Sequence, residues 1–270
     1  NTTDPASGEY HTKKDILEAE LANAEQILKE GSSAADIMVV DNKDTEGYDS
    51  HITFRGGLNV YQPLGVTVRA GDTITVYAGG PRHEIGDGTR LQVVVSQYHG
   101  SSNAVFRSVG YLKAGPNEIT IPAVDNMDLE RGGQIYIAYT GTAGAEEYGV
   151  RVVGGTRIPV LDLSDMSLRT MDDPLSDETC RTKVMNYIDA LEDMQGKAQQ
   201  LHEENHTDYP WQPQNCVYEA TDIVTRYTML SLATERVLAG IGNGTKEEKA
   251  QNLVMSLKAM DEMMYLFYQH

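Results

Sequence analysis

Five consecutive residues suggest chemistry by their types and spacing, because His202-Glu203-Glu204-Asn205-His206 matches the pattern H-E-x-x-H. On a helix, histidines four residues apart share one face and can bind zinc, while the glutamate acts as a base on the metal-bound water. Glu219 would supply a third ligand further along the chain. This pattern defines one candidate zinc site.

The residues around the motif favour a solvated helix end instead. The two x positions are Glu204 and Asn205, and the flanking residues 199–200 and 207–208 are all polar. Pro210 follows closely, and the residue before a proline disfavours the α region, so the helix must end or kink there. A zinc centre needs a rigid helical face and packed partners that orient its ligands. We predict that this motif is not catalytic and that the chain alone holds no stoichiometric zinc.

Two loops offer weaker cation candidates. His83-Glu84 and Asp87 lie in a glycine-rich turn, and residues 125–128 read Asp-Asn-Met-Asp. Calcium binds oxygen ligands of this kind, but the second loop lacks a bidentate acid at the required offset. Both loops are more typical of solvated turns. There is no G-x-S-x-G elbow and no phosphate-binding glycine loop. The residues therefore indicate no catalytic, cofactor-binding or metal site in this chain.

Charge excludes several classes of partner. The 270 residues include 22 Lys and Arg against 40 Asp and Glu, for a net charge of −18. Nucleic acid demands a basic footprint, and anionic lipid attracts basic segments, so neither is an expected partner. No apolar run reaches the roughly 18–20 residues of a membrane span. The first residue is Asn1, with no Met and no signal-peptide core, so we expect an excised or processed piece.

The two cysteines leave the redox compartment open. Cys180 and Cys216 would form one bridge or remain two small buried thiols, and their spacing does not decide between these.

Strand patterns fill the middle of the chain. Residues 12–30 first predict a short amphipathic helix, and the polar residues 41–47 predict a linker. Five β-rich runs follow, separated by glycine turns and without intervening helices, which indicates an antiparallel β-sandwich over residues 51–160. The runs are 73–77, 91–95, 117–121, 134–139 and 148–153.

Helical spacing follows Pro159. One stripe runs from Val184 to Leu201 at intervals of four and three, and a last helix begins at a Thr245 cap. The last helix has Ala250, Leu253, Leu257, Met260, Met264 and Phe267 on its predicted core face. Residues 220–239 mix strand and helix signals. The predicted fold class is α+β, with an N-terminal helix and linker (1–50), a β-sandwich domain (51–160) and a helical segment (161–270).

An ordered set of segments resembles the enhancin-like zinc metallopeptidases, a family that includes viral enhancins and bacterial mucin-degrading enzymes. The resemblance covers about residues 55–270 and rests on the order of the segments, since no single turn is diagnostic. The segments are GVTVRAGDTITVYAG (65–79), LKAGPNEITI (112–121), GGQIYI (132–137), VRVVGG with IPVLDL (150–155 and 158–163), EATDIV (219–224) and MDEMM (260–264).

The resemblance implies a secreted or cell-surface zinc endopeptidase of the gluzincin type that hydrolyses O-glycosylated proteins such as mucins. In that family the H-E-x-x-H motif and its downstream glutamate lie well after the segment matched by residues 260–270. The family's zinc ligands therefore have no matching positions here, and residues 202–206 stand too early. This implies zinc in the parent enzyme, none in this chain, and the remainder of the peptidase domain as a partner.

A second hypothesis comes from another class of protein. The chain has 15 Tyr against three Phe and one Trp, and Tyr suits polar recognition surfaces. The alternative is a non-catalytic glycan-binding or adhesive module.

Overall fold

The computed structural model describes nine stretches of the chain. The predicted helix over 12–30, the linker over 41–47, the two loop candidates, His206 and Cys216 lie outside the described residues. The described residues are 2–3, 10–11, 38–40, 61–79, 90–97, 106–124, 132–140, 148–205 and 217–269.

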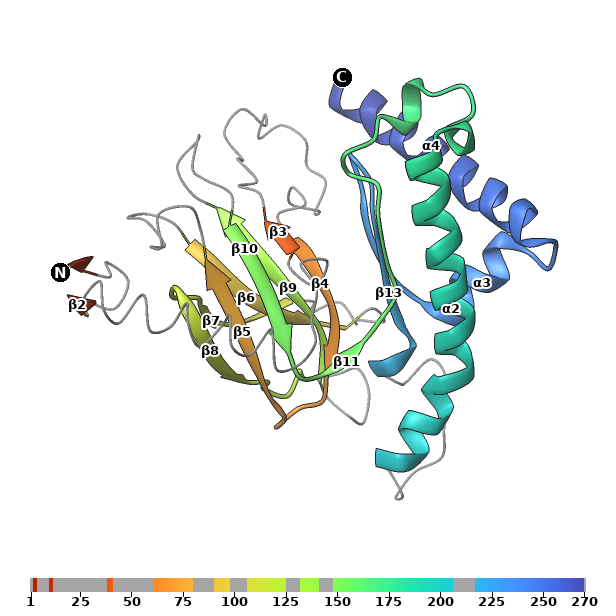
Figure 1. Ribbon diagram of the computed structural model, residues 1–270. Helices are drawn as coiled ribbons and strands as arrows, with labels where there is room; N and C mark the ends of the chain where they lie inside the picture. The colour runs from red at the N-terminus through yellow and green to blue at the C-terminus, as the bar shows by residue number, and fades with distance from the viewer. Residues whose placement is uncertain are drawn as a thin grey trace.

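The described residues before Pro159 form antiparallel strands, as predicted (Figure 1). A four-stranded sheet has the order β3 (Met38–Val40), β10 (Tyr148–Val153), β5 (Thr73–Gly79), β8 (Gly115–Thr120). A five-stranded sheet has the order β11 (Thr156–Arg157), β4 (Tyr61–Val68), β9 (Gly133–Thr140), β6 (Arg90–Ser96), β7 (Phe106–Tyr111). Every neighbouring pair in both sheets is antiparallel. We call these two sheets the two-sheet unit. The pair β1 (Thr2–Thr3) and β2 (Tyr10–His11) is separate.

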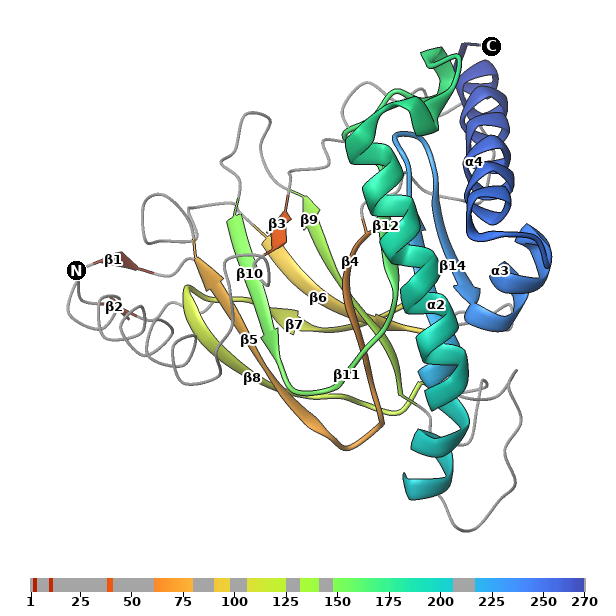
Figure 2. The same ribbon diagram turned by 45° about the vertical axis from the view of Figure 1, so that its right-hand side comes forward.

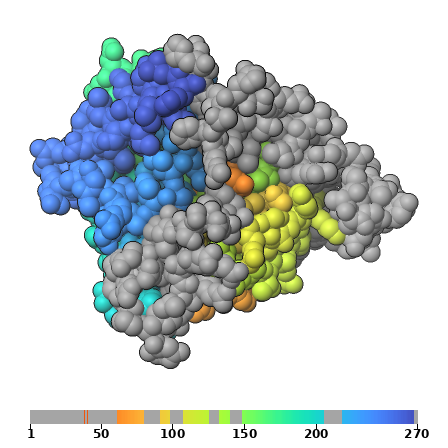
Figure 3. Space-filling view, turned by 180° about the vertical axis from the view of Figure 1, so that it is seen from behind, coloured from red at the N-terminus to blue at the C-terminus, as the bar shows by residue number. Residues whose placement is uncertain are grey.

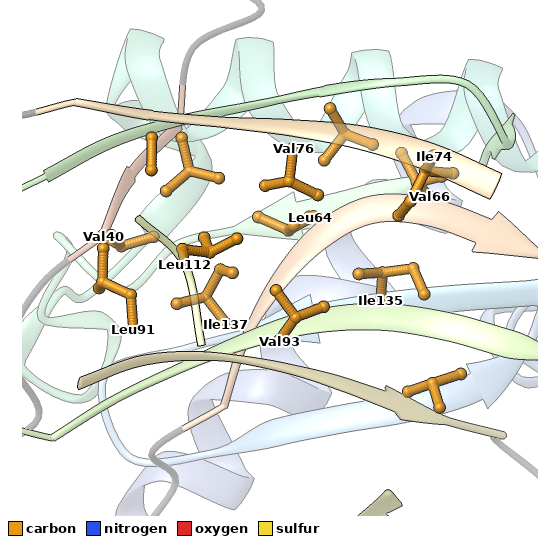
Figure 4. Close-up of a cluster of buried hydrophobic side chains, with 14 of the residues drawn as sticks. Val40, Leu64, Val66, Ile74, Val76, Leu91, Val93, Leu112, Ile135 and Ile137 are labelled. Atoms are coloured by element: carbon orange, nitrogen blue, oxygen red, sulfur yellow. The ribbon is translucent and has the colours of Figure 1, made fainter. Parts of the chain in front are cut away.

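One apolar core joins the two sheets. Val40 and Val76 from the four-stranded sheet pack in the same cluster as Val93 and Ile137 from the five-stranded sheet (Figure 4). Alternate residues of a strand point to one face, which is why the β-rich runs supply this core. Each fully buried Val or Ile contributes about 1.5–3 kcal/mol relative to an exposed one.

Two glycines allow β9 to lie between its neighbours. A Cβ on Gly132 would lie 1.9 Å from the carbonyl oxygen of Val68, and a Cβ on Gly133 would lie 1.9 Å from that of Ser96. These oxygens belong to β4 and β6, the strands that flank β9. The glycine pair in the segment 132–137 is thus a packing requirement of this sheet.

The chain after Pro159 forms a second unit around three strands. β12 (Val160–Asp162) pairs in parallel with β13 (Ala220–Val224), which pairs antiparallel with β14 (Met229–Ala233). The helices are α2 (Glu178–Asn205), α3 (Thr234–Ile241) and α4 (Lys246–Gln269), with short 3-10 turns η2 (Leu168–Thr170), η3 (Pro174–Ser176) and η5 (Val217–Glu219). Residues 220–239 are thus a hairpin followed by a helix, so the segment predicted as helical also contains a sheet.

The β13–β14 hairpin lies between the two-sheet unit and α2 (Figures 1 and 2). Ile223 of β13 shares a core with Ile188 of α2 and with Leu253 of α4. Among the described residues, the helices include none that is long and apolar enough to cross a membrane.

The two long helices agree with the predicted patterns, with one error. Thr245 and Glu248 bond reciprocally at the start of α4: the Thr245 backbone N donates to Glu248 Oε2 at 2.7 Å, and the Glu248 backbone N donates to Thr245 Oγ1 at 3.2 Å. This is a capping box. The prediction that Phe267 lies on the core face of this helix is wrong, since its side chain is 53% exposed.

Candidate functional site

Residues 202–205 of the H-E-x-x-H motif form the end of α2, and the first two of these side chains have different surroundings. His202 is 2% exposed, so our expectation that it lies at a solvated helix end is wrong for this residue. Glu203 is exposed, and its Oε1 accepts a hydrogen bond of 2.7 Å from Gln199 Nε2 one turn earlier. In a hydrolytic zinc site the base must border the metal-bound water. The described residues show a buried His202 beside an exposed Glu203, and the catalytic role of the motif stays a prediction.

No group of three His, Cys, Asp or Glu side chains within the described residues is able to hold a metal ion. His206 lies outside those residues, so the absence of zinc at this motif stays a prediction. Cys180, in the first turn of α2, is a free and buried thiol in the core that α2 shares with the hairpin.

Glu219, the proposed third ligand, is buried in a structural position. Its side chain is 2% exposed, and its carboxylate accepts a hydrogen bond from the backbone N–H of Glu235 in the first turn of α3. Burial raises the pKa of Glu219 to about 7, although this hydrogen bond lowers it. The carboxylate supports the start of α3, where the helix dipole favours a negative charge.

A second buried carboxyl fixes the tip of the hairpin. Asp261 of α4 is fully buried and accepts a hydrogen bond from Thr225 Oγ1 and one from the backbone of Tyr227. Burial raises the pKa of this carboxyl, while both hydrogen bonds lower it. This contact ties the turn between β13 and β14 to α4.

The most connected polar group lies where the two units meet. Four side chains, which we call the Asp222 cluster, join β9 to the hairpin: Gln134, Tyr136, Asp222 and Ser231. Tyr136 OH donates to Asp222 Oδ1 at 2.8 Å, and Gln134 Nε2 lies 3.4 Å from the same oxygen. Gln134 Nε2 also donates to Ser231 Oγ at 2.6 Å, and Tyr136 OH lies 3.1 Å from that hydroxyl.

Strand alternation explains why these side chains meet. In β9, Ile135 and Ile137 point into the core of the two-sheet unit, so Gln134 and Tyr136 point to the opposite face. In β13, Ile223 packs toward α2, and Asp222 points toward β9.

The hairpin register and the other face of β13 complete the arrangement. Asp222 and Ser231 are direct partners in the β13–β14 register. On the α2 side of β13, Tyr187 OH lies 2.7 Å from Thr221 Oγ1, which donates to the carbonyl oxygen of Pro159 at 2.8 Å. Both faces of the hairpin are therefore held by hydrogen bonds.

Burial and hydrogen bonds from three neighbouring side chains set the electrostatics of the Asp222 carboxyl. Asp222 and Tyr136 are both 0% exposed. Burial raises the pKa of Asp222 to about 7, while the hydrogen bonds from Tyr136, Ser231 and Gln134 lower it. Asp222 Oδ2 has no hydrogen-bond partner among the described residues. Burial, with the charge of Asp222 added, raises the pKa of Tyr136 well above its ordinary value.

Apolar side chains close one flank of the cluster, since Val94, Tyr136 and Ala138 form a buried group with Tyr61 and Met229 packed against it. The arrangement couples two structural units through a carboxyl whose pKa burial raises. Sequence reasoning missed it. The available signals were an aspartate inside the β-rich run 220–224 and polar residues at alternate positions of β9.

Comparisons with known proteins find similar folds and no similar sequence. No protein-family model matches the chain, and no curated protein matches it. A solved metallopeptidase from Bacteroides thetaiotaomicron is similar in fold, with a TM-score of 0.50 and 15% identity over 87% of this chain and 34% of that one. At this identity the likeness concerns the fold alone.

Two clostridial structures overlap less well. The M60 catalytic domain of Clostridium perfringens ZmpC, solved with the sialyl T antigen, has a TM-score of 0.43 and 19% identity over 68% of this chain and 31% of that one. The ZmpB metallopeptidase of the same organism has a TM-score of 0.43 and 20% identity over 68% and 31%. The chain spans about a third of the length of each of these three structures.

Proposed function

We propose that this chain is the N-terminal portion of a secreted zinc metalloendopeptidase that acts on O-glycosylated proteins such as mucins outside the cell. The observation that carries the proposal is the likeness in fold to the Bacteroides metallopeptidase, which extends over 87% of this chain. The ordered segments that resemble the enhancin-like peptidases point the same way, but no family model matches the chain. The substrate class comes from that resemblance.

In this proposal the chain supplies the structural framework of the enzyme, and the remainder of the peptidase domain supplies the zinc ligands. Residues 51–160 form the β-sandwich, and residues 161–270 begin the peptidase unit. The Asp222 cluster holds the first hairpin of the peptidase unit against β9. The 270-residue chain is inactive by itself.

The test compares the product of the complete reading frame with the 270-residue chain. Each is incubated with an O-glycosylated mucin, with the same mucin after removal of its O-glycans, and with EDTA. We expect the long protein to cleave only the glycosylated substrate, to lose activity in EDTA and to regain it with zinc. A long protein that binds the mucin without cleaving it would favour the adhesive module instead.

The chain alone provides a second test. We expect no mucin cleavage and no zinc after dialysis. Cleavage by this chain that is abolished in Glu203→Gln, or one zinc per chain that is lost in His202→Ala, would show that the motif at 202–206 is the catalytic one. The matched control is Glu204→Gln, since Glu204 is also exposed and accepts a bond of 2.7 Å from Gln200.

A further inference from the structure

The two units have separate apolar cores. The buried core of the two-sheet unit draws its side chains from residues 40–152, and the core around α2 and α4 draws its side chains from residues 161–257. Among the described residues, no side chain belongs to both clusters. Figure 3 shows the second unit in blue and strands of the two-sheet unit in orange to yellow-green. A unit with its own core can stay folded when its contact with a neighbour changes.

The apolar group at the junction is small and comes mostly from one side. Its buried members Val94, Tyr136 and Ala138 all belong to the five-stranded sheet. Met229, at the start of β14, is half-buried against this group and belongs to the second unit. The hydrogen bonds of the Asp222 cluster therefore carry much of the contact between β9 and the hairpin.

The two oxygens of the Asp222 carboxyl have different surroundings. Oδ1 accepts a hydrogen bond of 2.8 Å from Tyr136 OH, whereas Oδ2 is buried and has no hydrogen-bond partner among the described residues. An ionised carboxylate in such a place loses its hydration, and one of its oxygens gains nothing in return. If the units separate, water reaches both oxygens. Ionisation of Asp222 therefore favours separation.

The neighbouring titratable groups bring no positive charge to Asp222. Tyr136 faces it from β9, and Tyr187 lies on the α2 side of β13. Burial raises the pKa of both hydroxyls, so both stay neutral up to pH 8. Tyr61 of β4 packs on the apolar group at the junction, and Asp162 is exposed on β12. The charge of an ionised Asp222 is thus compensated by hydrogen bonds alone.

We propose that the contact between β9 and the β13–β14 hairpin is a pH-dependent latch, in which the two units dock while Asp222 holds its proton and separate as it ionises. Burial raises the pKa of Asp222 from 3.8 to about 7 in the docked form, and the separated form has the ordinary value. The separated form binds fewer protons between these values, so docking weakens as pH rises. The ratio of separated to docked molecules should rise about tenfold per pH unit between about pH 4 and pH 7.

Oxidation of Met229 by hydrogen peroxide tests the latch. A thioether has no proton to lose, so its intrinsic reactivity is the same at each pH. We expect Met229 in the 270-residue chain to oxidise at least about threefold faster at pH 8 than at pH 5, because separation uncovers it. The controls are Met38 and Met185, which are half-buried against the cores of the two units and should keep their rates. A constant rate at Met229 would overturn the proposal, and an equal rise at all three would overturn it in favour of global loosening.

Two variants connect the response to the carboxyl. Asp222→Asn cannot ionise, so Met229 should react at pH 8 as slowly as at pH 5. Asp162→Asn is the matched control, and it should keep the wild-type response. An unchanged response in Asp222→Asn would refute the role of this carboxyl.

Small-angle X-ray scattering gives a second measurement that needs no variant. The radius of gyration of the wild-type chain should be larger at pH 8 than at pH 5, and equal radii would contradict separation. Neither measurement involves zinc or cleavage, so the latch and the proposed function can fail independently.

Discussion

Replacing Asp222 by asparagine should remove a large pH dependence of stability. Asp222 is 0% exposed, and burial raises its pKa from 3.8 to about 7. Between these two values the folded chain keeps a proton that the unfolded chain has lost. The folded state then binds more protons, so stability falls as pH rises from about 4 to about 7. The difference of about 3 pH units, at 1.36 kcal/mol per unit, corresponds to about 4 kcal/mol.

Asparagine has nearly the same shape and never ionises. Its oxygen can still accept from Tyr136 OH, which donates to Asp222 Oδ1 at 2.8 Å. We expect Asp222→Asn to be close to the wild type in free energy of unfolding at pH 4 and below, and more stable by up to about 4 kcal/mol at pH 8. Urea denaturation followed by circular dichroism at four pH values measures this difference.

The control is Asp162→Asn, since Asp162 is exposed on β12 of the same sheet. The pH dependence of the Asp222→Asn difference is read relative to that of this exposed carboxyl. If the difference for Asp222→Asn does not change with pH, Asp222 ionises without cost in the folded state, and the account of the junction is wrong.

Three further tests concern a glycine of β9, the tyrosine of the Asp222 cluster and the cap of α4. Gly133→Ala should cost about 3 kcal/mol or more, because its Cβ would lie 1.9 Å from the Ser96 carbonyl oxygen, whereas Gly196→Ala in α2 meets nothing within 4 Å and should gain about 0.5–1 kcal/mol. Tyr136→Phe should cost about 1–3 kcal/mol, and more at pH 8 than at pH 5, because it removes a donor to the ionised carboxylate. Thr245→Ala should cost about 1 kcal/mol through the lost cap, and Thr245→Ser should restore most of it. Urea denaturation checks all three.

Much of the fold could be predicted because its signals are local. The β-rich runs became β5, β6, β8, β9 and β10, and the stripe from Val184 became α2. Thr245 and Glu248 stand three residues apart, so the capping box is visible in the sequence itself. Phe267 shows the limit of such patterns. Helical spacing groups residues on a face, but it does not say how far along the helix that face is covered.

The hairpin at 220–233 could not be predicted for a physical reason. β13 is the middle strand of its sheet, with β9 on one face and α2 on the other. A strand buried on both faces has no simple apolar alternation. Thr221 and Asp222 are tolerated there because Pro159, Tyr187 and Tyr136 provide their hydrogen-bond partners. Those partners lie far away in the sequence, so the segment Ala-Thr-Asp-Ile-Val (220–224) by itself indicates neither a strand nor a helix.

Separation along the sequence also explains why the Asp222 cluster could not be predicted from the sequence. Its β9 members precede its hairpin members by 86 to 97 residues, so only the folded chain brings them together.

A buried carboxyl such as Asp222 is weak evidence for stability, because an apolar replacement is often as stable. It does specify register, however. A slip of β13 by one residue would place Thr221 or Ile223 opposite Tyr136, leave its hydroxyl without a carboxylate acceptor, and bury Asp222 against the apolar core beside α2. The cluster thus selects one alignment of the hairpin on β9, and the chain retains an acid with a pKa near 7 at the junction of its two units.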